Sequence, residues 1–331
     1  MSEKTTIALS CGAKLFTPSA LNRLRKLGDL VIRESDKEPT PEEVAQLAHN
    51  ADILITSWGS PNLDESLIRQ LPHLRFVAHA AGSVKPIVSD AMWSRGIRVV
   101  NSAKVLGMGV AETALGLTIS TVKNFFNVSK SLSAGGWHED YDDIREMFEL
   151  TIGVIGGGMA GSHYMKLLQM FDVDILLNDP FITAEDAKKC YNAEKVELDE
   201  LLRRSDVISI HAPSIPETHH MFNSDTLALM KKDAILINTA RGSIIDEEAL
   251  YQHMKAGNLK YACLDVFDPE PPRSDHPLRT LPNCIMTPHL AGLTHNGLLR
   301  IGSHCVGEIE RYLNGQPLTT EVTQQQLSTI A

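Results

Sequence analysis

The sequence predicts an α/β protein made of two doubly wound parallel-sheet domains. Short apolar runs alternate with longer segments of helical periodicity along the whole chain, which is the pattern of strands joined through helices. The alternation restarts near Asn101, so two sheets are expected. The length of 331 residues also fits about two domains. Strands that alternate with helices over short connections form a parallel sheet with helices on both faces.

The first hundred residues contain one round of this alternation. The helices expected at residues 17–28 and 40–50 each begin with Thr-Pro, which places a threonine N-cap before a proline at the first helical position. A third helix is expected at residues 63–71. Apolar runs rich in Ile, Leu and Val predict strands at residues 6–10, 29–32, 52–57, 75–80 and 97–101.

The second round is longer and continues to the end of the chain. A single helix is expected over residues 103–132, followed by a polar, exposed segment over 133–148. A last helix over 297–315 should end at Gly315, and the polar tail 319–331 is expected to be loosely held. The strands predicted between these helices lie at residues 149–156, 174–179, 206–212, 234–240, 261–267 and 284–289.

Charge and cysteine content narrow the classes of function. The net charge of −10 disfavours nucleic acid and anionic membranes as main partners. The N-terminal segment lacks the apolar core of a signal peptide, and no apolar run approaches the ~20 residues that span a bilayer. A cytoplasmic protein without a disulfide scaffold or metal site is expected, because its scattered cysteines form no C-x-x-C pair: Cys11, Cys190, Cys263, Cys284 and Cys305.

A glycine-rich turn predicts a dinucleotide site. Residues 156–161, with glycines at Gly156, Gly158 and Gly161, fit G-x-G-x-x-G. The pattern alone is weak, but here it follows a predicted strand and opens a helix, and the next strand ends in Asp179. This arrangement is the full strand–helix–strand unit that binds dinucleotides. A purely structural glycine turn is the alternative.

The residue types of this turn suit the ligand. The first glycine permits the tight turn, the second lets backbone approach the pyrophosphate, and the third allows close helix–strand packing. The helix N-terminus, at Met159 and Ala160, directs N–H groups at the anion. Asp179 would accept hydrogen bonds from ribose hydroxyls and repel a 2′-phosphate, and residues 180–186 offer no Arg or Lys to receive one. NAD is therefore expected rather than NADP.

Polar residues follow three later strands, at the edge where such sheets bind ligands. Arg241, Asp265 and His289 each come at or just after an apolar run. Glu270 is flanked by Pro269, Pro271 and Pro272, which restrict the backbone around one carboxylate. Each residue alone would more often be structural, such as an Arg in a surface ion pair. Together they form a chemically complementary set.

These stretches resemble the NAD-dependent D-2-hydroxyacid dehydrogenase family, which includes D-lactate, glycerate and phosphoglycerate dehydrogenases and glyoxylate/hydroxypyruvate reductases. The matching stretches lie in order over most of residues 152–292: GVIGGGMAG, HAPSIPETHHMF, LINTARGSIIDEEAL, LDVFDPEPP and TPHLAG. The combination of INTARG, DVFDPEP and TPH is far more specific than the glycine motif.

The resemblance implies a role for each catalytic position. Arg241 matches the arginine that binds the substrate carboxylate, for which its planar fork is suited. His289 matches the general acid–base, and Glu270 matches the carboxylate paired with that histidine. The three prolines would then hold Glu270 where His289 needs it. The expected reaction is hydride transfer between NAD(H) and a small D-2-hydroxy acid or 2-oxo acid.

The resemblance also implies contacts to cofactor and substrate. Ala81 and Gly82 correspond to a loop whose backbone amides hold the substrate, together with Arg241 and His289. The positions expected to contact the cofactor are Gly156, Gly158, Met159, Ala160, Gly161, Asp179, His211, Ala212, Pro213, Thr239, Ala240 and Asp265, of which Asp265 matches a contact to the nicotinamide carboxamide.

The chain departs from the family pattern at three places. Ala80 replaces the first glycine of the substrate loop, which puts loop shape and substrate size in question. Met159 and Ala160 stand where a basic and then an apolar residue are usual. Ser214 stands where leucine is commoner, beside the expected nicotinamide wall.

The family's chain path implies a discontinuous flavodoxin-like substrate domain, residues 1–100 plus 291–331, and a Rossmann NAD-binding domain, residues 101–290. A homodimer through the NAD-binding domain is implied as well. Two alternatives stay open. One is an NAD-sensing binding protein of the corepressor type, which recruits partners and has no substrate to turn over. The other is a Rossmann protein that reduces other carbonyl compounds.

Overall fold

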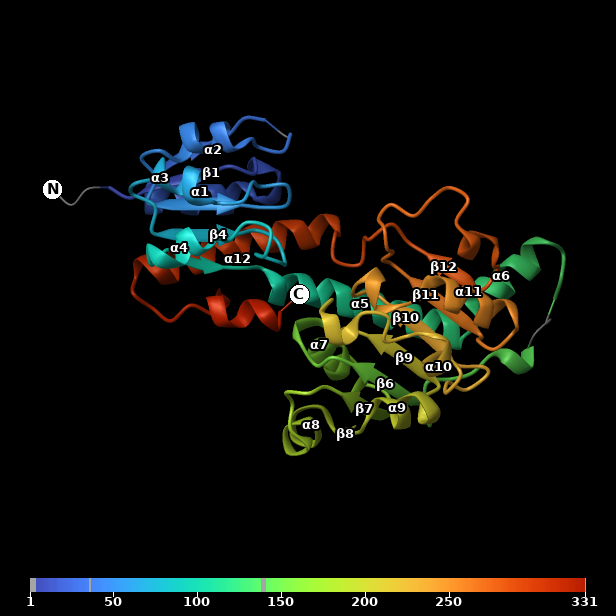
Figure 1. Ribbon diagram of the computed structural model, residues 1–331. Helices are drawn as coiled ribbons and strands as arrows, with labels where there is room; N and C mark the ends of the chain where they lie inside the picture. The colour runs from blue at the N-terminus through green and yellow to red at the C-terminus, as the bar shows by residue number, and fades with distance from the viewer. Residues whose placement is uncertain (1–3, 36, 138–140, 331) are drawn as a thin grey trace. The chain divides into compact units, whose positions relative to one another are not determined.

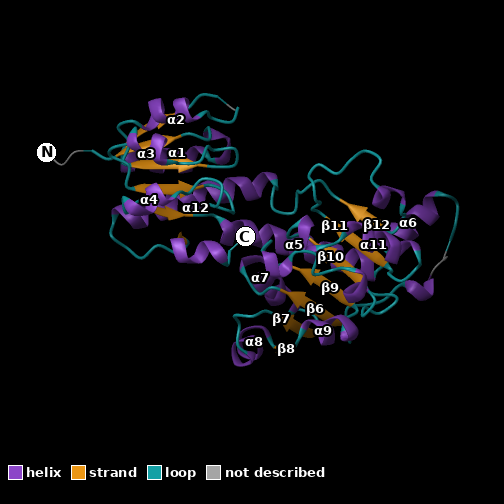
Figure 2. Ribbon diagram, viewed as in Figure 1, coloured by secondary structure: helices purple, strands orange, loops and turns teal. Residues whose placement is uncertain are grey.

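The computed structural model describes residues 4–35, 37–137 and 141–330. The chain divides into two compact units, one holding Met1–Leu106 together with Leu293–Ala331 and the other holding Gly107–Gly292. In each unit a sheet forms the central layer and helices cover its faces (Figures 1 and 2).

The first unit contains a six-stranded sheet in the order β13-β5-β4-β3-β1-β2. All its neighbouring strands are parallel except β13, which runs antiparallel to β5. The order of the five parallel strands is that of a flavodoxin-like sheet. The strands are β1 (Thr6–Leu9), β2 (Asp29–Ile32), β3 (Ile53–Thr56), β4 (Phe76–His79), β5 (Arg98–Val100) and β13 (Glu321–Val322).

Both faces of this sheet are covered. Alternate residues of a strand point to opposite faces, so Ile7 packs with α1 and α12 in one apolar core while Ala8 packs with α2, α3 and α4 in another. The Phe76 ring of β4 stacks on Tyr312 of α12 at 4.3 Å. The helices are α1 (Pro18–Leu27), α2 (Pro41–Ala48), α3 (Glu65–Arg69), α4 (Asp90–Ser94) and α12 (His295–Leu313).

The second unit contains a seven-stranded parallel sheet in the order β12-β11-β10-β9-β6-β7-β8. Its first six strands along the chain have the Rossmann order 3-2-1-4-5-6, with a seventh beyond them. The strands are β6 (Thr151–Ile155), β7 (Asp174–Asn178), β8 (Ala193–Lys195), β9 (Val207–Ile210), β10 (Ile235–Asn238), β11 (Tyr261–Leu264) and β12 (Cys284–Met286).

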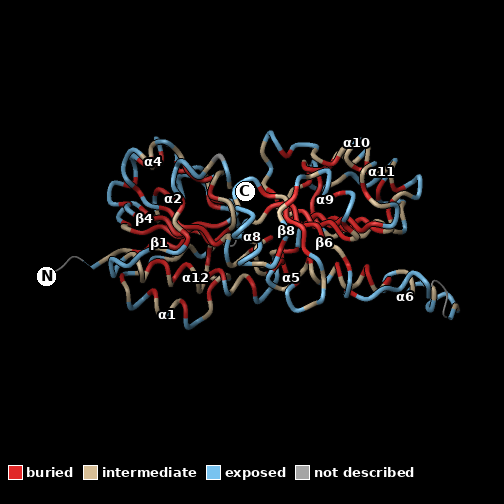
Figure 3. Tube along the Cα trace, turned by 90° about the horizontal axis from the view of Figure 1, so that it is seen from below, coloured by how far each residue is buried: buried red, intermediate tan, exposed pale blue. Residues whose placement is uncertain are grey.

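Two cores enclose this second sheet. Residues of α5, α7 and α8 pack in one core, and residues of α9, α10 and α11 pack in the other. The buried positions follow the strands, as Figure 3 shows in red. The helices are α5 (Ala103–Val122), α6 (Phe125–Ser133), α7 (Met159–Leu168), α8 (Ala184–Tyr191), α9 (Leu198–Arg204), α10 (Ser224–Leu227) and α11 (Glu247–Lys255). The predicted fold class, with one Rossmann and one flavodoxin-like sheet, is confirmed by the two strand orders.

The single long helix predicted over residues 103–132 is wrong, because the chain forms α5 and α6 with a break between them. Asn124 adopts a left-handed conformation with φ 53°. Its side chain accepts a hydrogen bond of 2.7 Å from the buried Tyr261 hydroxyl, which holds the break in place. Part of the exposed segment predicted over 133–148 falls on residues 138–140, outside the described residues.

The tail predicted to be loosely held is also wrong. Val322 in β13 is buried and pairs with β5. The cause is Glu308 of α12, whose buried carboxylate accepts hydrogen bonds from the backbone N–H groups of Thr319 and Thr320 and from the Thr319 hydroxyl. Strand β8, which the sequence analysis missed, is short and carries Glu and Lys instead of an apolar run.

Helix α5 is long and apolar enough to cross a membrane by length and composition alone, contrary to the expectation from the sequence. Its residues Ala111, Ala114 and Val122 are buried in the core of the second unit. Over its most apolar stretch 39% of the helix is buried, so one face packs against this core.

Candidate active site

The glycine turn lies at the carboxyl end of β6 and opens α7. Gly156 has φ +88°, and a Cβ atom there would lie 2.8 Å from the Ala212 nitrogen. A Cβ on Gly161 would lie 2.0 Å from the Gly156 oxygen. Both positions therefore require glycine for the turn itself. Around Gly158 there is open space within 4 Å, so this glycine leaves room for a ligand to approach the backbone.

The start of α7 offers backbone donors to an anion. Gly158 is the N-cap residue and provides no side-chain cap. Met159 is exposed and Ala160 is half-buried. The first N–H groups of a helix lack intrahelical partners, and they lie here beside the open space at Gly158. This arrangement fits a pyrophosphate.

Asp179 joins the end of β7 to the glycine turn. Its Oδ2 accepts a hydrogen bond of 2.8 Å from the Gly157 N–H. Its Oδ1 accepts bonds of 2.8 Å from the N–H groups of Phe181 and Ile182. The carboxylate is thus held in place with one acceptor site remaining, on Oδ2, which suits a ribose hydroxyl.

Two orphaned polar atoms mark the neighbouring strand ends. Among the described residues, the buried Thr239 Oγ1 after β10 and the buried His211 Nδ1 after β9 have no hydrogen-bond partner. Beyond His211, Ala212 is buried and Pro213 is half-buried. A buried hydroxyl without a protein partner is unusual. The turn, the acidic residue and these atoms lie along β7, β6, β9 and β10, which fits a dinucleotide lying across the sheet edge.

His289 and Glu270 form a direct pair. The His289 Nδ1 lies 2.7 Å from the Glu270 Oε2, and both side chains are solvent-accessible. The other carboxylate oxygen, Oε1, accepts a hydrogen bond of 3.0 Å from the Phe267 N–H. The backbone at His289 is left-handed, with φ 51°. One oxygen of the Glu270 carboxylate is therefore held by the backbone, and the other faces the imidazole of His289.

Asp265 holds the loop that carries His289. The backbone of the loop is bonded to the backbone of Asp265, because the His289 N–H donates to the Asp265 carbonyl at 2.8 Å. The buried Asp265 carboxylate then accepts hydrogen bonds from the Leu290 N–H at 2.9 Å, from the Ala291 N–H at 2.8 Å and from the Thr287 hydroxyl. Sequence reasoning gave Asp265 a cofactor contact and missed this anchoring role.

Arg241 lies on the turn after β10, close to Glu270. Burial lowers the pKa of Arg241, and the negative charge of Glu270 opposes that shift. The turn is shaped by Asn238, whose side chain accepts from the Ala240 N–H at 3.0 Å and donates to the Arg241 carbonyl at 2.9 Å. A Cβ on Gly242 would lie 2.1 Å from the Phe267 carbonyl carbon. The backbone of the Arg241 turn therefore packs directly against the backbone of the loop that carries Glu270.

A second carboxylate supports the Glu270 loop. Glu247, at the start of α11, accepts a hydrogen bond of 3.0 Å from the Asp268 N–H and pairs with His276 Nε2 at 2.7 Å. Sequence reasoning missed Glu247 and Asn238. Both side chains hydrogen-bond to backbone groups of a loop. In the sequence, only their position in the DEEAL and INTARG stretches could have indicated these roles.

The predicted substrate loop belongs to the first unit. Ala81 and Gly82 follow β4, and the Ala81 carbonyl accepts from the Ser102 N–H at 2.9 Å. His79, at the end of β4, is buried with its Nδ1 2.9 Å from the Thr56 hydroxyl. Burial lowers the pKa of His79 to about 4. The loop is therefore fastened at its base by a neutral imidazole.

Comparison with known proteins identifies the family. The model for the NAD-binding domain of D-isomer specific 2-hydroxyacid dehydrogenases matches residues 115–291. The chain belongs to this family. Its sequence is 32% identical over 308 residues to a glyoxylate reductase of Thermofilum pendens, covering 92% of the chain and 91% of that protein.

Two further proteins are similar to the chain over most of its length. A D-3-phosphoglycerate dehydrogenase of Methanocaldococcus jannaschii is 35% identical over 297 residues, which cover 90% of the chain but only 56% of that longer protein. The solved structure of the TT0316 protein of Thermus thermophilus superimposes with a TM-score of 0.79 at 28% identity, covering 96% of the chain and 100% of that protein.

The family membership settles the class of protein and its cofactor. The chain carries the NAD-binding domain of an NAD-dependent family of oxidoreductases, and the glycine turn and Asp179 fit that cofactor. The curated relatives reported above are a reductase and a dehydrogenase. They give no support to the alternative of an NAD-sensing corepressor.

Proposed function

We propose that the protein interconverts a small D-2-hydroxy acid and its 2-oxo acid, with His289 as acid–base, Glu270 as its partner and Arg241 as the carboxylate-binding group. The observation that carries the proposal is the 2.7 Å pair of His289 and Glu270 beside the guanidinium of Arg241. NAD(H), when bound, supplies or accepts the hydride.

The pairing decides which nitrogen reacts. An ionised carboxylate only accepts hydrogen bonds, so Nδ1 of His289 carries a proton. The Nε2 atom is then the nitrogen that exchanges a proton with substrate. In reduction, Nε2–H protonates the carbonyl oxygen while carbon receives the hydride, and the product is the 2-hydroxy acid. In oxidation, bare Nε2 takes the hydroxyl proton.

Arg241 binds and orients the substrate. A guanidinium can hold a carboxylate through two parallel N–H···O bonds. In a 2-oxo acid the carbonyl lies next to that carboxylate, so the same grip would bring the reacting carbon to a fixed position. We also propose that the backbone amides of Ala81 and Gly82, in the first unit, bind the substrate. Residues 1–100 plus 291–331 would then form the substrate domain and 101–290 the cofactor domain.

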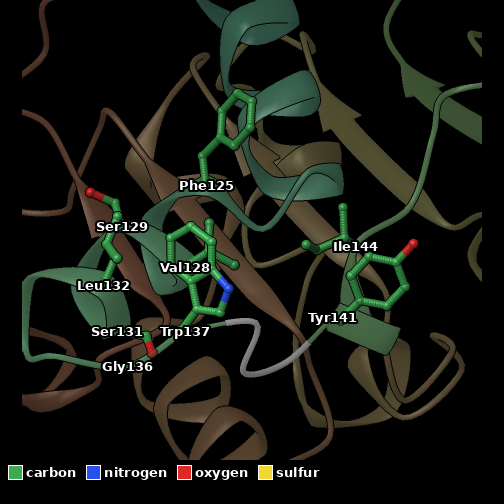
Figure 4. A pocket seen from close by; sticks show the side chains of 9 residues that line it. All are labelled: Phe125, Val128, Ser129, Ser131, Leu132, Gly136, Trp137, Tyr141 and Ile144. Carbon is green, nitrogen blue, oxygen red and sulfur yellow. The ribbon is translucent and has the colours of Figure 1, made fainter.

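We also propose a homodimer formed through the NAD-binding unit. Apolar side chains on α6 and the segment after it surround a hollow of about 530 Å³, shown in Figure 4. Phe125, Leu132, Trp137 and Tyr141 are each more than half exposed, at 54%, 56%, 73% and 69%. Exposed apolar area of this kind is typical of a protein interface. Sedimentation of the wild-type protein tests this, because a monomer at micromolar concentration would contradict it.

The reaction is tested with purified protein, NADH and a panel of 2-oxo acids that includes glyoxylate, hydroxypyruvate, pyruvate and phosphorylated homologues. We expect loss of the reduced-nicotinamide absorbance with at least one of them. NADPH should support less turnover, because Asp179 repels a 2′-phosphate. Absence of turnover across the panel, in protein shown to bind NADH, would contradict the proposal.

The net charge of −10 agrees with a cytoplasmic protein that binds no nucleic acid or membrane.

A further inference from the structure

One carboxylate connects the two ends of the segment that carries Glu270. The Glu247 Oε1 accepts a hydrogen bond of 3.0 Å from the Asp268 N–H, and the Glu247 Oε2 lies 2.7 Å from the Nε2 of His276. Asp268 precedes Glu270 in the chain and His276 follows it. Glu247 therefore fastens the start and the end of residues 268–276 to the first turn of α11.

The composition of this segment leaves few backbone groups by which it can be held. Proline has no N–H group, and residues 269, 271 and 272 are prolines. The backbone N–H donors of residues 268–272 are therefore those of Asp268 and Glu270 alone. A segment with so few donors cannot be fixed by a ladder of backbone hydrogen bonds. The bond from Asp268 to Glu247 is thus one of the few backbone contacts that can fix the start of this segment.

The peptide group between Phe267 and Asp268 is held from both sides. Its N–H donates to Glu247, and its carbonyl carbon would lie 2.1 Å from a Cβ on Gly242. Gly242 follows Arg241 and begins the short 3-10 turn that leads to α11. The stretch of chain that begins at Arg241 and ends at Glu247 therefore contacts this peptide group through both of its polar ends.

The Glu270 carboxylate depends on the same backbone. The Phe267 N–H donates to the Glu270 Oε1, and the Glu270 Oε2 faces His289. This N–H belongs to the peptide group just before the one that Glu247 holds, and the two planar groups meet at the Phe267 Cα. A shift of one group therefore moves the other. The direction of the Glu270 carboxylate toward His289 follows from the position that Glu247 gives this backbone.

The Glu247 carboxylate is itself fixed by its surroundings. Its side chain is 13% exposed, and that of His276 is 17% exposed. An ionised carboxylate only accepts hydrogen bonds, so the His276 Nε2 carries a proton and donates it to Glu247. The His276 Nδ1 is buried and has no partner among the described residues, which agrees with a ring whose proton is on Nε2. The N-terminus of α11 also stabilises the negative charge of Glu247.

We propose that Glu247 is a positioning residue for the reaction, which holds the segment of Glu270 against the Arg241 turn so that the Glu270 carboxylate faces His289. The proposal rests on the proposed function, because Glu247 acts only through Glu270 and His289. It requires no contact between Glu247 and the substrate or the cofactor.

The sharpest variant is Glu247→Ala, which removes both contacts. Its effect on the pair is measured without turnover, by ¹⁵N NMR of histidine-labelled protein at about pH 9, well above the ordinary pKa of histidine. The signal of His289 is assigned by its loss in His289→Gln. We expect His289 to carry its proton on Nδ1 in the wild type, and to distribute it over both ring nitrogens in Glu247→Ala because the oriented acceptor is lost.

Turnover gives a second measurement. Glu247→Ala should lower kcat by about 10–100-fold, the effect of a misplacement on the order of 1 Å, and should leave NADH affinity within about two-fold of wild type. In a Glu270→Gln background the same change should lower kcat by less than about two-fold, because the carboxylate that Glu247 positions is gone. A general loss of structure would lower kcat alike in both backgrounds.

Glu248→Ala is the matched control. Glu248 is the next residue in the first turn of α11, is exposed, and accepts a hydrogen bond of 2.7 Å from Gln252. Its replacement removes the same charge from the same helix N-terminus. It should leave both the proton position on His289 and kcat unchanged.

If Glu247→Ala fails to fold, Glu247→Gln carries the test. Its amide oxygen can still accept from the Asp268 N–H, but its NH2 group finds no acceptor at the protonated Nε2 of His276. It should therefore change the His289 ring and kcat in the same directions as Glu247→Ala, to a smaller degree.

The proposal is overturned if His289 keeps its proton on Nδ1 in Glu247→Ala as fully as in the wild type, or if Glu247→Ala costs as much kcat in the Glu270→Gln background as without it. Equal effects from Glu248→Ala would also overturn it. Absence of turnover with every 2-oxo acid would contradict the proposed reaction instead, and the NMR measurement would then decide the role of Glu247.

Discussion

The Nδ1 atom of His289 lies 2.7 Å from the Oε2 atom of Glu270, and the Oε1 atom of the same carboxylate is bound by the Phe267 N–H. The carboxylate is therefore oriented by a contact on each oxygen, while both side chains of the pair stay solvent-accessible. In the proposed mechanism this carboxylate keeps the proton on Nδ1 and leaves Nε2 to exchange protons with a substrate.

Replacing His289 by Gln should lower kcat by about 10²–10⁴, because the proton donor for the carbonyl oxygen is lost. NADH affinity should stay within two-fold of wild type, since no residue of the glycine turn changes. The measurement is steady-state turnover together with NADH titration. His49→Gln, at an exposed histidine of the other unit, serves as the control. Turnover that survives in His289→Gln would remove this residue from the mechanism.

Arg241→Gln should raise KM for the 2-oxo acid and lower kcat/KM by about 10–100-fold, the value of charge-assisted hydrogen bonds to a carboxylate. Arg241→Lys should recover only part of this loss, because an ammonium cannot make the bidentate grip. NADH binding is expected to be unchanged in both variants. A KM equal to that of wild type in Arg241→Gln would show that another group binds the carboxylate.

Asp179→Asn should reduce the preference for NADH over NADPH by about ten-fold, because the negative charge that repels a 2′-phosphate is removed. Asparagine keeps an oxygen that can accept from backbone N–H groups, so the turn should stay folded. Asp179→Ala lacks that acceptor for Gly157, Phe181 and Ile182 and should also weaken NADH binding. Unaltered selectivity in Asp179→Asn would mean that a different group reads the ribose.

Acid should destabilise the protein through His79. Burial of this side chain lowers its pKa from 6.5 to about 4. The unfolded chain binds a proton near pH 6.5 while the folded protein does not, so stability is full above that pH and falls as pH drops toward 4. The loss attributable to His79 is up to about 3 kcal/mol. His211, with its pKa lowered to about 3, adds to the same decline.

The test of this prediction is denaturant unfolding at several pH values between 4 and 7. His79→Gln should show a shallower fall of the unfolding free energy with acid than wild type, whatever its stability at neutral pH. An unchanged slope in His79→Gln would show that His79 does not titrate in this range.

Local signals in the sequence predicted most of the fold. Thr17 and Thr40 cap their helices as the Thr-Pro pairs indicate, and Gly315 has the left-handed φ of 63° expected after a helix end. The break at Asn124 and the fastened tail were not predicted. They depend on Tyr261 and Glu308, which are distant in sequence and reveal their partners only in the folded chain.

In the candidate site, too, some residues could be predicted from the sequence and others could not. Gly156, Asp179, Arg241, Glu270 and His289 could be named because motifs place them at strand ends. The anchoring of the His289 loop by Asp265 and the shaping of the Arg241 turn by Asn238 could not be predicted. These are contacts between side chains and the backbone of other segments, for which sequence spacing carries no signal.

The most direct test of the account is a double-mutant cycle on kcat for His289→Gln and Glu270→Gln. If Glu270 acts through His289, the double variant should turn over at the rate of His289→Gln alone, within about two-fold, because residues that act as a unit are strongly non-additive. A double variant slowed by the product of the two single effects would contradict the account, since the carboxylate would then act independently of the imidazole.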